Sequence, residues 1–311
     1  MPVRIAIPLP HSEDREYAER AIPQYERAVT LAGGEPVRIP LDQTPATVMK
    51  LIERCDAILL PGSKADVDPA KFGSMRSPHA AACDPGRDTV DELLLQDAFN
   101  MRKPILGICY GLQILNVYRT GSLVQHIPDF LPEETRTRVN HEAGRKVAVA
   151  HEVEIAAESK LAEILCGDSR PRLSGRAKLG TDSKELDPQS APAPSHGENR
   201  EGHGFSRADS AAKSSRALAP EGDKLVIPVN SSHHQSADSI GDGLRVVARC
   251  PDDGIVEALE GTSPDHFVLA VQWHPERSVD EDEPSRAIFK ALVEAAGVRR
   301  QQLTGDFESV K

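Results

Sequence analysis

Short apolar runs alternate with helical patterns over the first 120 residues of this chain. Runs rich in Val, Ile and Leu predict strands at 3–7, 36–40, 56–62 and 104–108. The last run is fully apolar, as expected of a central strand in a parallel sheet. Helices are predicted between the strands. The first has Pro23 near its start and Gly33-Gly34 at its end, and the second covers 46–55. The third covers 87–102, and one of its faces carries Val90, Leu93, Leu94, Ala98 and Met101. This alternation predicts a doubly wound α/β sheet.

The middle of the chain has a different pattern. Residues 166–224 contain no Val, Ile, Tyr or Trp, and Ser, Gly and Pro supply 21 of these 59 residues. We interpret this segment as a flexible insertion, because it can bury too little apolar surface to offset the entropy lost on ordering. The alternative is a poorly patterned small subdomain.

Regular structure resumes in the last third of the chain. Segments rich in β-forming residues lie at 224–235, 244–250, 254–261 and 267–276, and a helix over 284–297 places Ala287, Ile288, Ala291, Leu292 and Ala295 inward. The sequence therefore predicts one domain over residues 1–297, interrupted at 166–224, followed by a polar tail at 298–311.

Composition narrows the classes of function. The net charge of −11 argues against nonspecific binding of nucleic acid. No segment approaches the ~18 apolar residues that a transmembrane helix needs, and the first residues lack the apolar stretch of a signal peptide. The five cysteines are scattered and form no C-x-x-C pair, which argues against a disulfide framework or a zinc cluster. These features predict a cytoplasmic protein with no nucleic-acid or membrane partner.

The sequence Gly107-Ile108-Cys109-Tyr110-Gly111 lies where the fourth predicted strand meets a helix. A nucleophile on a sharp strand-to-helix turn adopts a strained backbone, and the residues two before and two after it must be small. The positive end of the following helix favours the thiolate, and the backbone N–H of Tyr110 then faces the position of a tetrahedral oxyanion. The alternative is a buried cysteine beside glycines that serve packing, and this pentapeptide alone does not decide between the two.

A cysteine nucleophile needs a base and a group that orients the base. His274 and Glu276 follow the apolar strand 267–271, and alternate residues of an extended segment point the same way. Pro275 favours extended geometry here, so His274 can reach the thiol while Glu276 holds its other nitrogen. Alone, His-x-Glu usually belongs to a solvated surface. Together with the glycine-flanked cysteine, it predicts a catalytic triad.

With these residues in place, the sequence resembles the class I glutamine amidotransferase-like superfamily, whose triad is Cys, His and Glu in that chain order. Within it, the chain is most similar to the gamma-glutamyl-gamma-aminobutyrate hydrolase family. The resemblance is carried by LLPGSKADVDPAKFG, DPGRD, GICYGLQILNV, GSLVQHI, HEVEI, VNSSHHQ, DGIVEALE and VQWHPE. It implies a flavodoxin-like three-layer α/β/α sandwich with a mostly parallel central sheet.

The resemblance also implies a reaction. The expected enzyme hydrolyses γ-glutamyl amides through a γ-glutamyl thioester, with Cys109 as nucleophile, His274 as base and acid, and Glu276 as the orienting group. This chemistry requires no cofactor and no metal. The expected partner is a small γ-glutamyl substrate, and a homodimer is compatible with the sequence.

Further site residues follow from the same resemblance. Gly62 and Ser63 are expected to supply the second oxyanion N–H group, opposite Tyr110. Gln113 matches a position that contacts the glutamyl group, with a helix-packing amide as the alternative. The loop 231–235 matches the segment that commonly holds the glutamyl α-amino and α-carboxyl groups, which makes candidates of Ser232, His233 and His234. The alternative for the histidines is a structural pair rather than a metal site.

Three features remain open in the sequence. In the segment 84–88 we interpret Asp88 as a helix cap, with Arg87 facing a substrate carboxylate as the alternative. Many hydrolases of the family have Arg directly after the cysteine, where this chain has Tyr110, a residue familiar among true glutamine amidotransferases. The 166–224 insertion is also atypical. The competing functions are therefore a glutaminase subunit that supplies ammonia to a separate synthetase, and a non-catalytic binding protein on the same fold.

Overall fold

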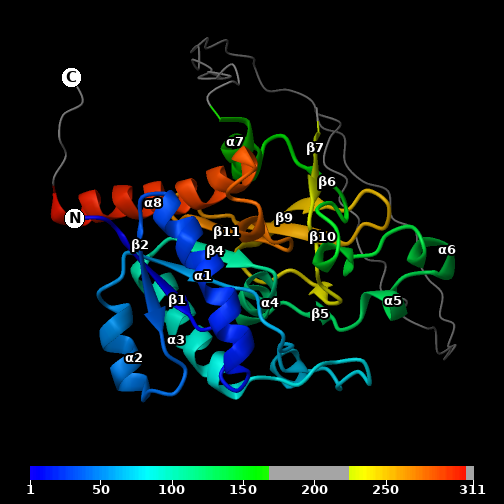
Figure 1. Cartoon of the computed structure of the whole chain (residues 1–311), viewed down its shortest axis with the longest axis horizontal. Coiled ribbons are helices and arrows are strands. Elements are labelled where there is room, and N and C mark those ends of the chain that lie inside the picture. The colour runs from blue at the N-terminus through cyan, green and yellow to red at the C-terminus, as the bar shows by residue number, and fades with distance from the viewer. Residues whose placement is uncertain (168–223, 306–311) are drawn as a thin grey trace, which may run out of the picture. The chain divides into compact units, whose positions relative to one another are not determined.

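The computed structural model describes residues 1–167 and 224–305, which form a nine-stranded sheet with helices on both faces (Figure 1). One part of the sheet is parallel, in the order β2-β1-β3-β4-β11, with the strands Glu35–Ile39, Arg4–Pro8, Ala57–Leu60, Ile105–Ile108 and Val268–Val271. Antiparallel pairs continue it as β10-β9-β6-β7, with the strands Val256–Gly261, Leu244–Arg249, His151–Ile155 and Leu225–Val229. The parallel order is that of flavodoxin-like folds. The predicted fold class is therefore confirmed.

Helices cover the two faces of the sheet in separate layers. The first layer contains α1 (Arg15–Leu31), α7 (Lys160–Cys166) and α8 (Glu283–Thr304). The second contains α2 (Pro45–Ile52), α3 (Pro85–Met101) and α4 (Tyr110–Tyr118). Alternate residues of a strand serve the two layers, so in β4 Leu106 and Ile108 join the first core while Ile105 joins the second.

Short elements complete the described residues. These are the helices α5 (Ile127–Phe130) and α6 (Glu133–Arg136), the 3₁₀ turns η1 (Pro69–Phe72), η2 (Ala143–Arg145) and η4 (Pro275–Arg277), and a small ladder of β5 (Leu123–Val124) with β8 (Ser236–Ala237). In Figure 1, α5 and α6 lie beyond the edge of the sheet that ends in β7.

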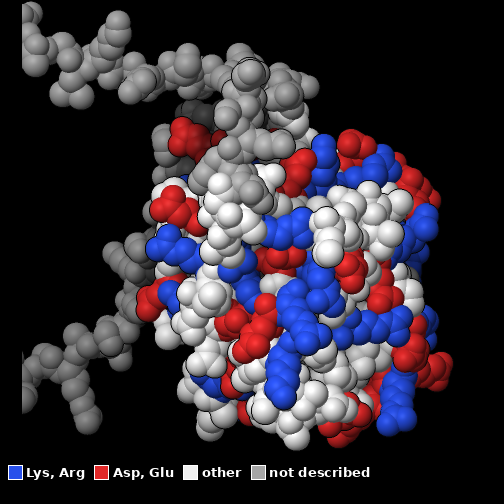
Figure 2. Space-filling view, turned by 90° about the vertical axis from the view of Figure 1, so that its left-hand side faces the viewer, with Lys and Arg blue, Asp and Glu red and all other residues white. Residues whose placement is uncertain are grey.

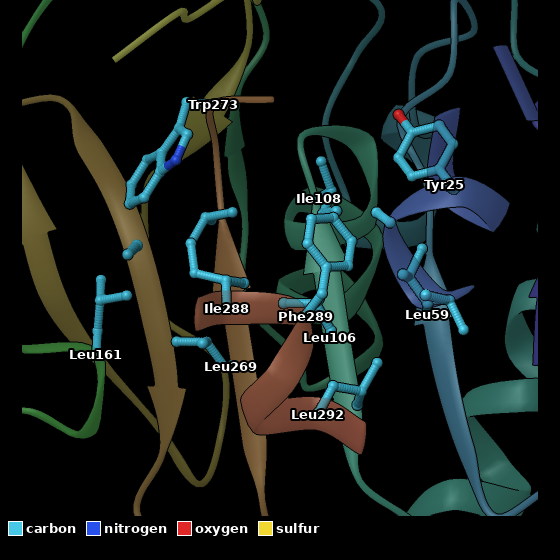
Figure 3. Close-up of a cluster of buried hydrophobic side chains, with 14 of the residues drawn as sticks. Tyr25, Leu59, Leu106, Ile108, Leu161, Leu269, Trp273, Ile288, Phe289 and Leu292 are labelled. Carbon is cyan, nitrogen blue, oxygen red and sulfur yellow. The ribbon is translucent and has the colours of Figure 1, made fainter. Parts of the chain in front are cut away.

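Figure 3 shows how α8 fills the first core. Ile288, Phe289 and Leu292 lie over the sheet among strand residues such as Leu106 and Leu269. Phe289 is 1% exposed and Leu292 is 0% exposed, so each removes a whole side chain from water, which stabilises the fold by about 1.5–3 kcal/mol.

Several boundaries differ from those that the sequence predicted. α1 begins at Arg15, well before Pro23, because Asp14 accepts the Tyr17 N–H as its cap and pairs with Lys64. Pro23 is then inside the helix, where it omits one backbone hydrogen bond. The last helix continues past Gly297 to Thr304, so the first residues of the predicted tail are helical.

Other differences concern single elements. Met101 is 54% exposed because it is the last residue of α3, beyond the reach of the core. Strand β6 was not predicted, although its sequence HEVEI alternates buried and more exposed positions. The predicted insertion at 166–224 lies outside the described residues except at its ends, so its flexible character stays a prediction.

On the face shown in Figure 2, basic and acidic residues are interspersed. Among the described residues, no helix combines the length and the apolar character needed to cross a bilayer.

Candidate active site

The parallel pairing of β4 with β11 brings two distant segments of the chain together. Ile108 pairs with Val271, and the N–H of Cys109 donates to the Val271 carbonyl at 2.8 Å. His274 follows Val271 closely in the chain and lies at the same end of the sheet. Gly62, which follows β3, lies close to both residues: a Cβ added there would lie 3.1 Å from Cε1 of His274 and 3.7 Å from Cβ of Cys109. The ends of three parallel strands therefore converge on this place.

Cys109 occupies a strained turn between β4 and α4. Its φ is 53° and its ψ is −105°, a region that residues with a side chain rarely adopt. A Cβ added at Gly107 would lie 2.7 Å from the Gly111 carbonyl oxygen, and one added at Gly111 would lie 2.1 Å from the Leu60 carbonyl oxygen. Both obstacles are backbone atoms, which no change of rotamer removes. The crowding between the two glycines was expected, whereas the approach of Gly111 to β3 was not.

His274 and Glu276 form a buried pair. Nδ1 of His274 donates to Oε1 of Glu276 at 2.8 Å. Burial lowers the pKa of His274, but the charges of Glu276 and Cys109 and the hydrogen bonds to both outweigh it and raise this pKa to about 9. Burial raises the pKa of Glu276, but the charge of His274 and its hydrogen bond lower this pKa overall. At neutral pH the imidazole is therefore protonated, with its second nitrogen available to the thiol.

Asn230 holds the backbone of His274. Its Oδ1 accepts from the His274 N–H, and its Nδ2 donates to the His274 carbonyl, both at 2.9 Å. These two bonds tie the imidazole-bearing residue to the loop 231–235 that follows Asn230. The sequence did not predict this role, because nothing local to VNSSHHQ shows that its Asn pairs with a residue 44 positions away.

The backbone groups predicted to stabilise an oxyanion differ in their partners. Tyr110 is the first residue of α4, a position where the N–H has no partner within its own helix. The Gly62 N–H donates to the hydroxyl oxygen of Tyr25 at 3.0 Å. Burial raises the pKa of Tyr25 well above its usual value, so this hydroxyl stays protonated. Within the predicted pair Gly62 and Ser63, the Ser63 N–H is therefore the better candidate donor.

The side chain of Tyr110 is buried beneath the site. It is 1% exposed, its hydroxyl donates to Asp88 at 2.8 Å, and the Arg87 guanidinium lies 4.8 Å from the centre of its ring. The residue after the cysteine therefore contributes packing and a backbone N–H in this chain. Its side chain is placed in the core, away from solvent.

Arg87 does not face a substrate. It is fully buried, its Nε donates to Asp91 at 2.8 Å, and its terminal nitrogens donate to backbone carbonyls, including that of Pro61 at 2.8 Å. The interpretation of Asp88 as a helix cap was also wrong. Asp84 caps α3 by accepting the Arg87 N–H, because the proline that follows Asp84 takes the first helical position.

Gln113 and the loop 231–235 meet at one carbonyl group. Nε2 of Gln113 donates to the Gln235 carbonyl at 3.2 Å, and Nδ1 of His233 donates to the same oxygen at 2.8 Å. Gln113 therefore supports the loop, as its packing alternative expected. A contact between Gln113 and a ligand stays a prediction.

The other candidates in this loop point in different directions. Ser232 is buried. Nε2 of His234 lies 3.0 Å from Oδ1 of Asp66, in the segment that follows β3. Nε2 of His233 lies 3.3 Å from Oε1 of Glu257, inside the molecule. The two adjacent histidines therefore do not act as a pair.

A second cysteine also lies near a histidine and a carboxylate. Cys250 lies beside His141 and Asp253, and Nε2 of His141 is 2.8 Å from Oδ2 of Asp253. Cys250 is 1% exposed, and burial together with the charge of Asp253 raises the pKa of its thiol to about 12. A thiol with this pKa is a poor nucleophile at neutral pH. The strained turn and the helix N-terminus distinguish Cys109 from it.

The sheet order and the cysteine on its strand-to-helix turn define a class I glutamine amidotransferase-like α/β domain. The peptidase C26 family matches residues 6–175 and 188–276. This chain belongs to that family of hydrolases, and the predicted family resemblance is confirmed.

Curated relatives carry two kinds of name. The chain is 32% identical over 273 residues to the "putative glutamine amidotransferase" of Mycobacterium tuberculosis, an alignment that covers 88% of this chain and 66% of the relative. It is 31% identical over 273 residues to the gamma-glutamyl-gamma-aminobutyrate hydrolase of Escherichia coli K12, an alignment that covers 88% of this chain and 84% of the relative. The chain therefore spans slightly less than two thirds of the mycobacterial protein and most of the E. coli one.

Solved structures with the same fold are more distant. A protein of Thermoplasma acidophilum described as part of a putative GMP synthase aligns with a TM-score of 0.54 at 13% identity, over 98% of both chains. The glutaminase domain of Trypanosoma brucei CTPS with bound acivicin aligns with a TM-score of 0.50 at 15% identity, over 94% of both chains. At these identities the likeness shows the fold alone.

Proposed function

We propose that this chain is a cysteine-dependent hydrolase that cleaves γ-glutamyl amide bonds. The observation that carries the proposal is the strained turn at Cys109 beside the buried pair of His274 and Glu276. A sulfur at a helix N-terminus, an imidazole that bonds it and a carboxylate that orients the imidazole are the parts of a nucleophilic triad. Membership of the peptidase C26 family and the identity to a gamma-glutamyl-gamma-aminobutyrate hydrolase support the type of bond.

The first half of the reaction forms a thioester. Sγ of Cys109 attacks the γ-carbonyl carbon, and the carbonyl electron pair moves onto oxygen, where the N–H groups of Tyr110 and Ser63 stabilise it. The oxyanion then collapses and the C–N bond breaks. Protonated His274 gives its proton to the departing amine, which leaves a γ-glutamyl thioester on Cys109.

The second half of the reaction uses the same groups in reverse. Neutral His274 takes a proton from water as the water oxygen attacks the thioester. Collapse of the second oxyanion breaks the C–S bond and releases glutamate. The Cys109 thiolate and the protonated His274 are then restored, and Glu276 stabilises the imidazolium whenever it forms.

The proposed substrate is a small molecule with a γ-glutamyl group and an amine leaving group, of the γ-glutamyl-γ-aminobutyrate type. Within the loop 231–235, Ser232 and His234 are the proposed contacts for the α-amino and α-carboxyl groups. His233 is less suited to this role, because its ring is directed at Glu257. We further propose a cytoplasmic location, which the scattered cysteines without a C-x-x-C pair support.

The test compares Cys109→Ala with Cys83→Ala, a control at a partly exposed cysteine that lies outside the proposed triad. Each purified variant is incubated with γ-glutamyl-γ-aminobutyrate, other γ-glutamyl amines and glutamine, and released glutamate is measured. We expect Cys109→Ala to lose turnover by at least ~10³-fold and Cys83→Ala to retain it. Added hydroxylamine should divert the wild-type thioester to γ-glutamyl hydroxamate.

Two other outcomes would favour the competing functions. Hydrolysis of glutamine that appears only after a second protein is added would indicate an ammonia-supplying subunit. No hydrolysis of any compound, together with equal alkylation rates at Cys109 and Cys83, would indicate a non-catalytic protein. Turnover close to wild type in Cys109→Ala would reject the assigned nucleophile.

A further inference from the structure

Three buried histidines and one buried glutamate converge at a place separate from the proposed triad. Glu257 lies on β10 and His151 begins β6, while His233 belongs to the loop 231–235 and His141 precedes η2. Oε1 of Glu257 lies 3.2 Å from Nδ1 of His141 and 3.3 Å from Nε2 of both His151 and His233. These four atoms all lie within 4.8 Å of one another. We refer to the four residues as the histidine–glutamate cluster.

The four converging atoms of the cluster are buried and lack hydrogen-bond partners among the described residues. Each side chain is at most 3% exposed. Within the described part of the chain, none of the four converging atoms makes a hydrogen bond of normal geometry. Buried polar atoms are nearly always satisfied, so four unsatisfied atoms aimed at one point need an explanation.

In each histidine one ring nitrogen, the inner one, faces Glu257, and the other, the outer one, has a partner that shows whether it carries a proton. Nδ1 of His151 and Nδ1 of His233 lie 2.9 Å and 2.8 Å from backbone carbonyl oxygens, which can only accept. Nε2 of His141 lies 2.8 Å from the carboxylate of Asp253. All three outer nitrogens are therefore N–H donors. In a neutral ring, the inner nitrogen then carries a lone pair, and here it faces the carboxylate oxygen of Glu257.

Lone pairs that face a buried carboxylate repel it unless a cation lies between them. Metal-bound histidines characteristically donate their other N–H to a carboxylate or a carbonyl group. All three histidines show this arrangement.

We propose that His141, His151, His233 and Glu257 bind one divalent metal ion, for which Zn²⁺ is the best match. Three imidazole nitrogens and one carboxylate oxygen are a donor set that Zn²⁺ accepts in tetrahedral geometry. A tetrahedron with metal–ligand bonds of about 2.0 Å has edges of about 3.3 Å. The three N···O separations, 3.2, 3.3 and 3.3 Å, match three of the six edges, and all the ligand atoms lie within 4.8 Å of one another.

The site is structural rather than catalytic, because four protein ligands fill a tetrahedral zinc ion and leave no position for reactive water. Its effect falls on the loop 231–235. His233 donates to the carbonyl of the last residue in this loop, and that carbonyl also accepts from Gln113 of α4. At the other end of the loop, Asn230 bonds the backbone of the proposed base. Metal binding is therefore expected to order the loop that carries the proposed substrate contacts.

A pocket of about 270 Å³ reaches the cluster and provides a route for the ion. His141 and His233 both line it, together with residues of the segment from Ile127 to Glu142. The other groupings of possible metal ligands in the described residues are weaker. One, formed by His79, His126 and Asp129, is exposed or half-exposed, and another, formed by His141, Cys250 and Asp253, shares His141 with the cluster and has only three possible ligands.

The first test uses the untagged wild-type chain, because a polyhistidine tag would itself bind metal. The protein is stripped with a chelator, reloaded with one equivalent of Zn²⁺ or Co²⁺, dialysed and analysed for metal by mass spectrometry. We expect about one ion per chain and, with Co²⁺, the intense visible absorption of a four-coordinate site. Zn²⁺ at ~1,000 times its Kd should raise Tm by roughly 8–16 °C relative to the stripped protein.

The second test uses variants with matched controls. His151→Gln and Glu257→Gln should each lose most bound metal and most of the Zn²⁺-dependent rise in Tm. His126→Gln, which alters the exposed grouping, should keep both, and so should Cys109→Ala, which alters only the proposed nucleophile. Cys109→Ala tests the two proposals separately, because it should lose turnover under the proposed function and keep the metal under this one. If either cluster variant fails to fold, the wild-type stoichiometry and cobalt spectrum decide.

Clear results would overturn the proposal. Wild-type protein that retains less than ~0.1 equivalent of Zn²⁺ and of Co²⁺ after reloading, with no change in Tm, shows that the cluster does not bind these metals. Loss of the metal in His126→Gln but not in Glu257→Gln would place the ion elsewhere. An octahedral cobalt spectrum at full occupancy would contradict the four-ligand site.

Discussion

Glu276→Gln tests the electrostatic basis of the proposed triad. The substitution keeps the size of the side chain and removes the charge that does most to raise the pKa of His274. The difference between the ordinary histidine pKa of 6.5 and the value of about 9 corresponds to about 3 kcal/mol in favour of the protonated ring. Cys109 contributes to the same difference, so the loss of Glu276 predicts a fall in kcat/KM of up to about 10²-fold at pH 7.

The assay follows glutamate released from γ-glutamyl-γ-aminobutyrate, or from the best γ-glutamyl amide found for the wild type, as a function of pH. The alkaline limb of the profile should also move to lower pH, because the imidazole loses its proton more easily without Glu276. Glu294→Gln is the matched control, since that carboxylate lies on α8 with its side chain 63% exposed. Circular dichroism confirms that both variants are folded at the assay temperature. Activity within threefold of wild type and an unchanged pH profile would refute the orienting role of Glu276.

Three further predictions concern the turn, the loop and pH. Gly111→Ala should destabilise the fold by at least ~3 kcal/mol, because its Cβ would lie 2.1 Å from the Leu60 carbonyl oxygen. The control Gly297→Ala lies inside α8 with nothing within 4 Å and should stabilise the fold by about 0.5–1 kcal/mol. Urea unfolding measures both, and equal effects would contradict the steric reasoning. Asn230→Ala should reduce kcat about 10-fold, because it releases the backbone of His274. Asn230→Asp should retain part of the activity, since it keeps the acceptor for the His274 N–H. An unchanged kcat in the alanine variant would exclude the positioning role. The raised pKa of His274 means that its contribution to stability is complete below about pH 6.5 and is lost as pH rises through about 9. Activity should decline as pH rises through about 9, where the folded protein loses this proton, and a rate that still rises through pH 9 would contradict a protonated imidazole as the acid.

Cys109 and Cys250 show what a local sequence pattern can predict and what it cannot. The glycines around Cys109 predicted a strained turn, and the turn is there with a φ of 53°. The pattern works because a nucleophile elbow is a steric requirement confined to five consecutive residues. By contrast, the burial that raises the pKa of the Cys250 thiol to about 12 comes from segments distant in the chain, which no local pattern reveals.

Arg87 and Asn230 are two residues whose hydrogen-bond partners the sequence did not predict. For the segment around Arg87 we favoured a helix cap at Asp88, with a substrate contact at Arg87 as the alternative. Neither is present: Asp84 caps the helix, and the guanidinium lies fully buried on Asp91 and backbone carbonyls. Asn230 lies within the VNSSHHQ motif, but its partner is the backbone of His274. Both side chains have several hydrogen-bonding groups, so their partners depend on which distant segments reach them.

The sequence by itself determined the alternation of strands and helices over the first 120 residues, the parallel character of the central strands and the turn at Cys109, because periodicity and backbone sterics act over a few neighbouring residues. The sequence also predicted that His274 would reach Cys109, and the register of β4 with β11 is what brings the two segments together. Only the tertiary structure decided that β6, β10 and two loops gather three histidines around Glu257. These contacts depend on strand register and loop placement across the whole sheet, and such long-range geometry leaves no periodic trace in the chain.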